Sequence, residues 1–364
     1  MAQDDAVRMT WRTACGWLSG LVAAVVWAVA SARYMPIVQP TGSWLGDDGV
    51  TYPQLASNNT YWPRDVRHLA VLLALAGVLL IAGLGRRALV TGSVAAGGWL
   101  AADLLVDRLD LSGTVTVVLL AAAATVYFGA TSLTAKRLSG GQDGGPLVRH
   151  VAAGTAAMLA LASLLPVTPW IEHLSDAQLR IEIELMALKL GFATLFAVAA
   201  AGLLPRPVRN VRLTLGVTAV AVAAALAWIC LTGSAMGPDF TQIMPVAFVA
   251  VVVAAAAPRI NGTAPLLGLI FLGVFGAFAS LAVLYLAGML LGGALTGLAG
   301  NPPVNGADSD LATPLAAVVI GIGMSLASYL VTSAPTTAEA MGSETAGPAE
   351  PAGPATPAEP AAGA

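Results

Sequence analysis

The chain has 364 residues, of which 57% are hydrophobic and only 10% are charged, and its formal net charge is −3. A single water-soluble core of this composition would leave a large apolar surface uncovered, so the composition excludes a soluble globular protein. It predicts a polytopic membrane protein whose main partner is the lipid bilayer, and it gives no indication of nucleic-acid binding.

Ten apolar stretches are long enough to cross a bilayer. A bilayer core of about 30 Å requires roughly 20 apolar residues in a helix, because each residue adds about 1.5 Å. The predicted fold is therefore all-α, with ten transmembrane helices at residues 13–32, 66–84, 88–105, 115–133, 148–165, 185–204, 213–231, 243–257, 266–290 and 311–332. The eighth is the weakest, since it is short and carries Pro245 in its first turn.

The basic residues between these stretches predict the orientation, because cytoplasmic loops retain an excess of Lys and Arg. With the N-terminus inside, 11 of the 17 basic residues fall on the cytoplasmic side, and both termini are cytoplasmic. Thirteen of the 20 acids fall on the outer side. The cytoplasmic basic residues are Arg8, Arg12, Arg86, Arg87, Lys136, Arg137, Arg149, Arg206, Arg209, Arg212 and Arg259.

Residue usage predicts the compartment. Arginine greatly outnumbers lysine and alanine is abundant, which is typical of a GC-rich bacterial genome and favours a bacterial plasma membrane. The first predicted span ends in Ala30-Ser31-Ala32, a pattern that also fits a signal-peptide cleavage site. Cleavage there would leave nine spans and the same loop assignments.

The spans form two blocks of nearly equal length, residues 13–165 and 185–332. Five spans in each block give the blocks opposite orientations, which is the arrangement of an inverted repeat in many carriers. The long outer loop 33–65 of the first block, however, has only a short PRPVRN turn as its counterpart. Both a repeat and two unrelated blocks fit the sequence.

Polar segments flank the transmembrane domain 13–332. Residues 1–12 form a short cytoplasmic N-terminus. Residues 333–364 consist mainly of Pro, Ala, Thr, Gly and Glu, and such a segment does not bury enough apolar surface to offset its ordering entropy. We expect a disordered cytoplasmic tail, which either binds a partner through its Pro-rich repeats or serves no binding role.

The third span carries the first candidate site. Asp103, Asp107 and Asp110 are spaced i, i+4, i+7, which places three carboxylates on one helical stripe. Asp103 lies inside the apolar run, where a charge costs about 2.5 to 3.5 kcal/mol at the bilayer centre and needs compensation. The stripe either binds a proton, a cation or a polyol from the outside, or leaves the membrane with Arg108 as local partner and with Asp107 and Asp110 hydrated.

The sixth span adds Lys189, several residues inside its apolar region and on the face it shares with Glu182. One hypothesis is that Lys189 pairs with Asp103, because both lie at a similar depth below the outer surface. The alternative is that Lys189 extends to the lipid headgroups near a glutamate, as long basic side chains do.

The long outer loop carries a second candidate site. Asp47 and Asp48 precede a glycine, and Asp65 and His68 lie one helical turn apart at the start of the second span. Together with Glu172 and His173 they could hold a divalent cation through hard oxygen ligands. Asp-Asp-Gly is also an ordinary turn, so we expect no metal and no other cofactor here.

The adjacent Asp47 and Asp48 in the first outer loop of a multi-spanning protein resemble the acidic pair of membrane glycosyltransferases that use polyprenyl-phosphate donors. The resemblance covers only these two residues and their topological position. Those enzymes have a much longer stretch between the pair and the next span, and they are usually larger. The resemblance implies an enzyme that acts on a lipid-linked substrate at the outer face.

Small residues gather in the last two predicted spans. Gly288 and Gly292 are four residues apart in the ninth span, and Gly321, Gly323 and Ser325 stand at every second position in the tenth. Such spacing permits close helix packing. A break near Gly292 that exposes backbone carbonyls to an ion is the alternative.

The sequence supports three functional hypotheses. The first is a carrier or permease-like protein for a small or lipid-linked solute, based on the span number, the equal blocks and the intramembrane Asp103 and Lys189. The second is a non-catalytic membrane scaffold or accessory subunit, and the third is the outer-face enzyme. No nucleotide-binding loop, zinc-protease motif or hydrolase nucleophile motif occurs, so the sequence favours a function without catalysis.

Overall fold

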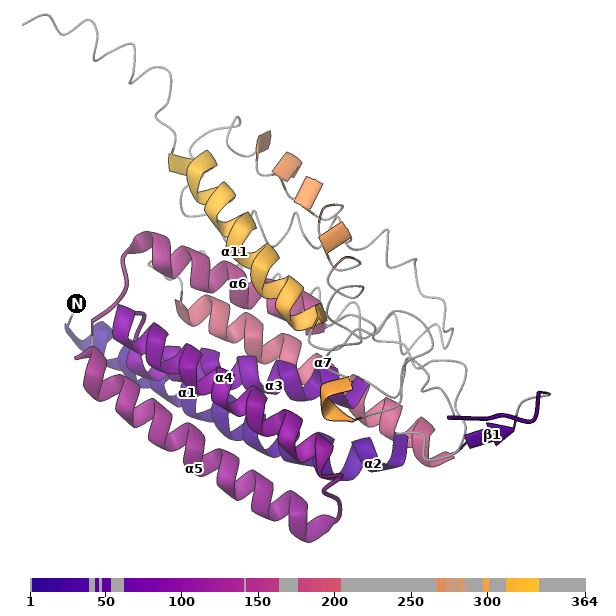
Figure 1. Cartoon of the computed structure of the whole chain (residues 1–364). Helices are drawn as coiled ribbons and strands as arrows, with labels where there is room; N and C mark the ends of the chain where they lie inside the picture. Colours follow the sequence, from indigo (N-terminus) through magenta and orange to yellow (C-terminus); the bar gives the residue numbers. More distant parts are fainter. Residues whose placement is uncertain are drawn as a thin grey trace, which may run out of the picture. The chain divides into compact units, whose positions relative to one another are not determined.

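The computed structural model describes residues 2–38, 43–45, 48–53, 62–140, 142–163, 176–203, 297–300 and 312–333, with scattered residues between 267 and 286. The chain has two compact units, Met1–Thr332 and Ser333–Ala364. Of the second unit the structure describes only the first residue, Ser333. The main elements are α1 (Ala2–Val29), the π-helical turn η1 (Ala30–Tyr34), α2 (Met35–Val38), α3 (Trp62–Ala82), α4 (Arg86–Arg108), α5 (Thr114–Ser139), α6 (Pro146–Ser163), α7 (Asp176–Leu203) and α11 (Ala312–Ser333) (Figure 1).

Four of the described helical segments are long and apolar enough to cross a membrane: Trp11–Ile37, Pro63–Ala82, Arg86–Arg108 and Thr114–Ser139. They coincide with the first four predicted spans, so the chain is a helical membrane protein as expected. Helices α6, α7 and α11 fall on the fifth, sixth and tenth predicted spans. The seventh and eighth spans lie outside the described residues, and the ninth is described only at scattered positions.

Proline and glycine explain several helix boundaries. Pro146 begins α6, where its missing N–H has no helical partner to lose. Gly140 follows α5 with φ 57°, a left-handed conformation that favours glycine. The π-helical turn Ala30–Tyr34 lies just before Pro36, whose ring crowds the carbonyl of Ala32 and cannot donate to it. The first helix therefore widens there and continues to Val38, six residues beyond the predicted span.

Helix α3 is the central helix of the described bundle. It contacts α1, α4, α5 and α7, and 89% of its most apolar window is buried (Figure 1). The corresponding share is only 17% for α4 and 11% for α5. Val94 and Val126 on these two helices are 70% and 71% exposed, as expected for side chains that contact lipid.

Glycines bring α1 against α3 and α5. A Cβ atom on Gly16 would lie 2.8 Å from the carbonyl oxygen of Gly77, and one on Gly20 would lie 2.0 Å from Cζ of Phe128. The pattern Gly16-x-x-x-Gly20 is the small-residue spacing that permits close helix approach. The sequence-based expectation of close packing concerned only the last two predicted spans, so this contact of α1 was not predicted.

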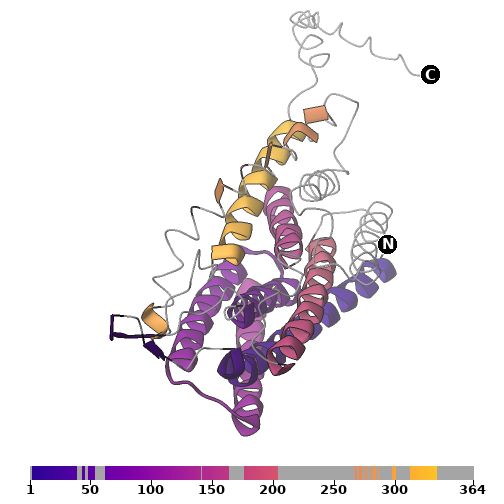
Figure 2. The same cartoon turned by 90° about the vertical axis from the view of Figure 1, so that its right-hand side faces the viewer.

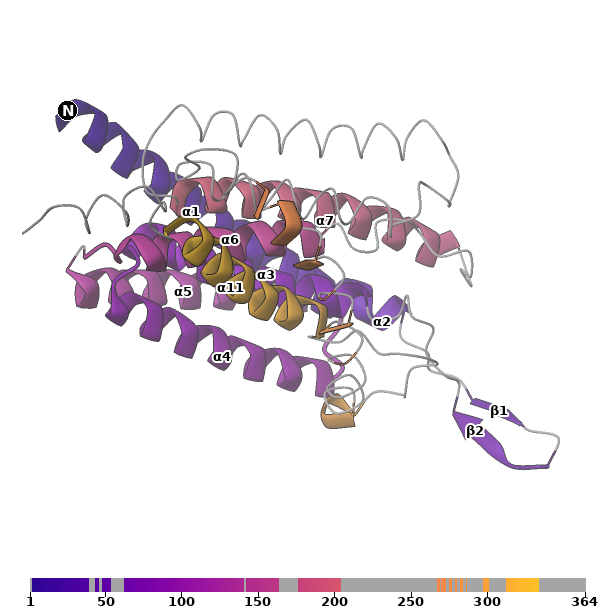
Figure 3. The same cartoon turned by 90° about the horizontal axis from the view of Figure 1, so that it is seen from above.

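The helices alternate in direction, so their connections define two ends of the bundle. We call the end that carries the α3–α4 and α5–α6 turns the turn end. At the turn end, the α3–α4 turn meets the α5–α6 turn: Ser139 Oγ donates to the carbonyl of Ala82 at 2.8 Å, and a Cβ on Gly85 would lie 2.9 Å from the carbonyl oxygen of Gln142. The early part of α1 reaches the same end, where Arg12 lies 3.6 Å from Asp143. The end of α1, the start of α3 and the end of α4 therefore meet at the opposite end, which we call the cluster end (Figure 3).

Helix α6 contacts α7, and it also packs closely on α11 (Figure 2). A Cβ on Gly321 would lie 2.7 Å from Cα of Thr155, and one on Gly154 would overlap Ser325. His150 Nε2 and Ser328 Oγ are 2.7 Å apart at this contact. Close packing at Gly321 is therefore confirmed, whereas a Cβ on Gly323 would meet nothing within 4 Å, and Gly288 and Gly292 lie outside the described residues.

The predicted outer loop contains a short hairpin. Strand β1 (Ser43–Leu45) pairs antiparallel with β2 (Thr51–Pro53), and Trp44 lies opposite Tyr52 (Figure 3). In the connecting turn the amide of Val50 donates to the Asp48 carboxylate at 3.0 Å. Asp48 therefore has the turn-forming role that Asp-Asp-Gly also predicts.

Candidate functional site

Five ionisable side chains of α3 and α4 form a buried ion cluster at the cluster end of the bundle. The exposed fraction of each residue is 5% or less. Two of these residues are acidic, two are arginines and one is a histidine. The ion cluster consists of Arg64, Arg67 and His68 on α3 and Asp103 and Asp107 on α4.

Asp103 is bonded from two neighbouring helices. Its Oδ1 atom accepts a hydrogen bond from the indole nitrogen of Trp27 on α1 at 2.6 Å and lies 3.2 Å from Nε of Arg67. Its Oδ2 atom lies 3.4 Å from Nε2 of His68. The carboxylate of Asp103 therefore connects α4 to both α1 and α3.

Asp107 lies one helical turn further along α4 and contacts both arginines. Arg67 Nη1 donates to its Oδ1 at 3.0 Å, and Arg64 Nη2 donates to its Oδ2 at 3.2 Å. The Arg67 guanidinium thus joins both carboxylates. A planar group with five donors suits this bridging geometry, which lysine could not reproduce.

The cluster follows from helical spacing and from the α3–α4 hairpin. Arg64, Arg67 and His68 are spaced i, i+3, i+4, and Asp103 and Asp107 are spaced i, i+4, so each set occupies one helical face. The two sets lie at similar distances in sequence from the turn at residues 83–85. Antiparallel helices joined by a short turn therefore bring them to the same depth.

The formal charges of the cluster balance without the histidine. Two guanidinium groups face two carboxylates, so the four charges cancel. Burial of a charge costs several kcal/mol unless a partner and hydrogen bonds compensate it, and here the two helices supply the partners to each other. Intramembrane ionisable groups of this kind commonly belong to ion pathways, proton relays or ligand sites.

Lys189 of α7 and Asp65 of α3 form a second pair of charges beside the cluster. Lys189 is 1% exposed, and the carboxylate that acts on it electrostatically is that of Asp65 on α3, which is 3% exposed. Nearby along α7, Glu184 accepts a hydrogen bond from the hydroxyl of Tyr34 at 2.5 Å. Polar contacts of α7 with α3 and η1 therefore lie at the cluster end.

The predicted carboxylate stripe is only partly present. Asp103 and Asp107 lie together, but α4 ends at Arg108 and Asp110 follows in an exposed turn with φ 48°. The alternative in which Asp107 is hydrated is wrong, because Asp107 is 5% exposed and bonded to α3. Arg108 donates to the carbonyl of Leu298 at 3.0 Å.

The hypothesis that Lys189 pairs with Asp103 is wrong, because each residue has other partners in the structure. Asp103 contacts Arg67, His68 and Trp27, whereas Lys189 interacts with Asp65. Lys189 does not extend outward either, because it is buried within the bundle. Glu182 belongs to α7, and its side chain lies outside what the structure describes.

The residues of the predicted outer-loop site have separate roles where they are described. Asp48 holds the hairpin turn, Asp65 interacts with Lys189, and His68 contacts Asp103. Asp47 lies outside the described residues, as do Glu172 and His173. Within the described ranges no group of three or more His, Cys, Asp or Glu side chains could hold a metal ion.

Three residues that bond to the acids were not predicted from the sequence: Trp27, Arg64 and Arg67. The sequence indicated only the side of the membrane on which the two arginines lie. The usable signal was their position, since Arg64 and Arg67 lie about as far before the α3–α4 turn as Asp103 and Asp107 lie after it. No comparable signal identified Trp27, because its contact depends on how α1 packs.

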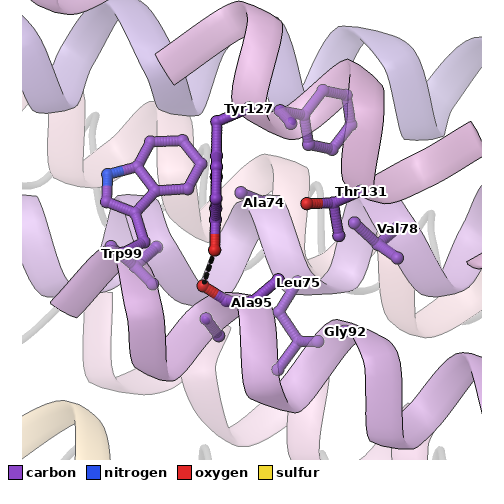
Figure 4. A pocket seen from close by; sticks show the side chains of 11 residues that line it. Ala74, Leu75, Val78, Gly92, Ala95, Trp99, Tyr127 and Thr131 are labelled. Carbon is purple, nitrogen blue, oxygen red and sulfur yellow. Dashed lines mark hydrogen bonds between the residues drawn. The ribbon is translucent and has the colours of Figure 1, made fainter. Parts of the chain in front are cut away.

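A small apolar cavity lies between α3, α4 and α5, toward the turn end from the cluster (Figure 4). Its volume of about 10 Å³ is at the lower limit for one water molecule. Trp99, Tyr127 and Thr131 line it, and the Tyr127 hydroxyl donates to the carbonyl of Ala95 at 2.9 Å. The ring of Trp99 also makes an edge contact with that of Trp27, so an aromatic column joins the cavity to the Asp103 contact.

Comparison with known proteins gives no relative of this chain: no protein family, curated protein or solved structure matches it.

Proposed function

We propose that the protein is a carrier or permease-like protein for a small or lipid-linked solute, and that the ion cluster closes its pathway at one end. The observation that carries this proposal is the burial of ionisable side chains inside apolar helices. Seven such residues of α3, α4 and α7 are at most 5% exposed: Arg64, Asp65, Arg67, His68, Asp103, Asp107 and Lys189. Charges at this depth are expensive for a protein that needs only a stable bundle, and pathways through membranes commonly use them.

We further propose that the cluster end faces outward in a bacterial plasma membrane, with ten transmembrane helices and both termini in the cytoplasm. The arrangement of basic residues at the turn end supports this orientation, because cytoplasmic ends are rich in Lys and Arg. The basic residues gathered there are Arg12, Arg86, Arg87, Lys136, Arg137 and Arg149.

A non-catalytic scaffold is the second candidate. It is favoured by the mutual pairing of the cluster charges and by the small volume of the cavity beside them. A closed network of this kind also suits a rigid membrane domain. The two candidates differ in one property: a carrier opens the cluster end to water from time to time, whereas a scaffold keeps it closed.

Cysteine accessibility in intact cells tests this difference. Cys15 and Cys230 are the only cysteines, and replacing both with serine gives a background for Ser31→Cys. Ser31 is 4% exposed and lies one turn after Trp27 on the same face of the helix. We expect an impermeant thiol reagent added outside to modify Ser31→Cys about 10- to 1000-fold more slowly than a fully exposed cysteine, as for a minor open state.

Two control variants make the result interpretable. Val50→Cys in the exposed hairpin gives the rate for an open site, and Ser132→Cys, buried in α5 with no exposed area, detects general unfolding. Modification of Ser31→Cys but not of Ser132→Cys supports the carrier. Complete protection of Ser31→Cys, or equal modification of both buried sites, rules out an opening at the cluster and leaves the scaffold.

A further inference from the structure

We infer that the transported solute is coupled to protons, and that the coupling proton is held between Asp103 and His68. This inference rests on the proposed carrier function and names its coupling ion. It follows from the geometry of one carboxylate oxygen, from the charge balance around it and from the kind of ion that the site could accept.

The two oxygens of Asp103 differ in their contacts. Oδ1 accepts the indole N–H of Trp27 at 2.6 Å and lies beside Arg67 at 3.2 Å. Oδ2 is fully buried, and among the described side chains it has no hydrogen bond of good geometry. Nε2 of His68 lies 3.4 Å from this oxygen. A proton on either atom would turn this contact into a hydrogen bond.

The surrounding charges make this proton the one that changes the charge of the site. Among the partners that the structure describes, Arg64 and Arg67 balance Asp103 and Asp107, and Asp65 balances Lys189 of α7. Among the described residues, α1 faces Asp103 with Trp27, which does not titrate, and η1 and α7 place Tyr34 and Glu184 at the edge. A proton added between Asp103 and His68 raises the total charge of the cluster by one.

A larger cation does not suit this site. Ca²⁺ requires six to eight oxygen ligands, and Mg²⁺ requires a regular octahedron of them. Both cluster carboxylates are already bonded to guanidinium groups, which repel a cation. A proton requires only the space between two side-chain atoms that are already in contact.

The charge balance also predicts whether protonation favours the closed or the open state of the cluster end. Without the proton the formal charges of the five cluster residues sum to zero. With it they sum to one positive charge, and an excess charge costs several kcal/mol more inside a protein than in water. Protonation should therefore favour states in which the cluster end is open and hydrated.

The test measures modification of Ser31→Cys from outside at about pH 5.5 and about pH 8, a range in which imidazoles commonly titrate. Each rate is divided by that of Val50→Cys at the same pH, which removes the pH dependence of the thiol reaction. We expect this ratio to rise about tenfold in acid, and we expect His68→Gln to abolish the rise. His150→Gln is the matched control, because His150 is also buried but bonds to Ser328 on α11.

Each outcome separates the two proposals. An acid response that is lost in His68→Gln and in Asp103→Asn but kept in His150→Gln supports the proton site. Modification at a ratio independent of pH, or a response that survives both cluster variants, overturns the proton site and leaves the carrier standing. No modification at either pH overturns the carrier and the proton site together.

Discussion

The two ends of the bundle both carry ion pairs, but in different surroundings. At the cluster end the side chains of Arg67, Asp103 and Asp107 are at most 3% exposed, whereas at the turn end Arg12, Arg149 and Asp143 are 14%, 22% and 40% exposed. Water screens the exposed pairs and limits each to about 1 kcal/mol or less, while a broken buried pair leaves a charge without solvent. Ion pairs between arginine and aspartate should therefore contribute strongly to the stability of the bundle at the cluster end and only weakly at the turn end.

The ends also differ in what holds their helices together. Toward the turn end, α1 and α3 meet through Gly16 and Gly77, whose backbones come close because neither has a side chain. Toward the cluster end, Trp27 on the same helix is tied to Asp103 by a hydrogen bond. A larger side chain should disrupt the close packing toward the turn end, whereas loss of a charge should disrupt the ion cluster. Substitutions of the two kinds can therefore measure the two contributions to stability separately.

The largest effect is expected for Arg67→Met. This change removes the cation that joins Asp103 and Asp107 and should lower the free energy of unfolding by about 3–5 kcal/mol. Chemical unfolding of the purified protein in detergent measures it. Arg108→Met, which affects an exposed arginine, is the control, and an equal loss in both variants would contradict the importance of burial.

Gly20→Ala should have the next largest effect. The new Cβ would lie 2.0 Å from the Phe128 ring, which is 1% exposed and has little room to move. We expect a loss of about 1–3 kcal/mol in the same unfolding measurement. Gly97→Ala is the matched control on α4, because a Cβ there meets nothing within 4 Å and alanine favours the helix. Unchanged stability of Gly20→Ala would mean that α1 is not packed closely there.

A double-mutant cycle between Asp65→Asn and Lys189→Met should show coupling of about 0.5–3 kcal/mol, because the two charges interact. The cycle between Asp103→Asn and Lys189→Met serves as comparison. Its single effects should add, since Asp103 interacts with Arg67 and His68. Additivity in the first cycle and coupling in the second would reverse the assignment of partners.

The smallest effect is expected for Asp143→Asn at the turn end. It breaks the exposed contacts with Arg12 and Arg149 and should cost about 1 kcal/mol or less, decreasing further in high salt. Unfolding at low and high ionic strength measures this. A loss as large as that of Arg67→Met would remove the distinction between the two ends.

Much of the described fold was predictable from the sequence, because lipid imposes a simple rule on helix length and apolar content. The first four spans were predicted within about four residues, except that the first helix continues to Val38 through its π-helical turn and α5 continues to Ser139, each six residues beyond the predicted span. The hairpin at Trp44 and Tyr52 was not predicted, since its strands are only three residues long. Whether the chain has ten spans stays a prediction.

The candidate site was predictable in part. The burial of Asp103 in an apolar helix indicated that a partner must exist, and the structure supplies three. The choice of Lys189 was wrong because hydropathy gives the depth of a residue but not the rotation of its helix or its neighbours. Depth combined with proximity along the chain favours Arg67 on the adjacent helix.

The ion cluster is formed by two consecutive helices, α3 and α4, and this has a consequence for how the protein enters the membrane. Helix α3 alone would carry the cations Arg64 and Arg67 into the lipid, and each such charge adds up to about 3 kcal/mol to the insertion free energy. Its counterions Asp103 and Asp107 arrive with the next helix to be synthesised. Helices α3 and α4 should therefore leave the translocon together with these four charges paired, so that α3 enters the bilayer only after α4 has been synthesised.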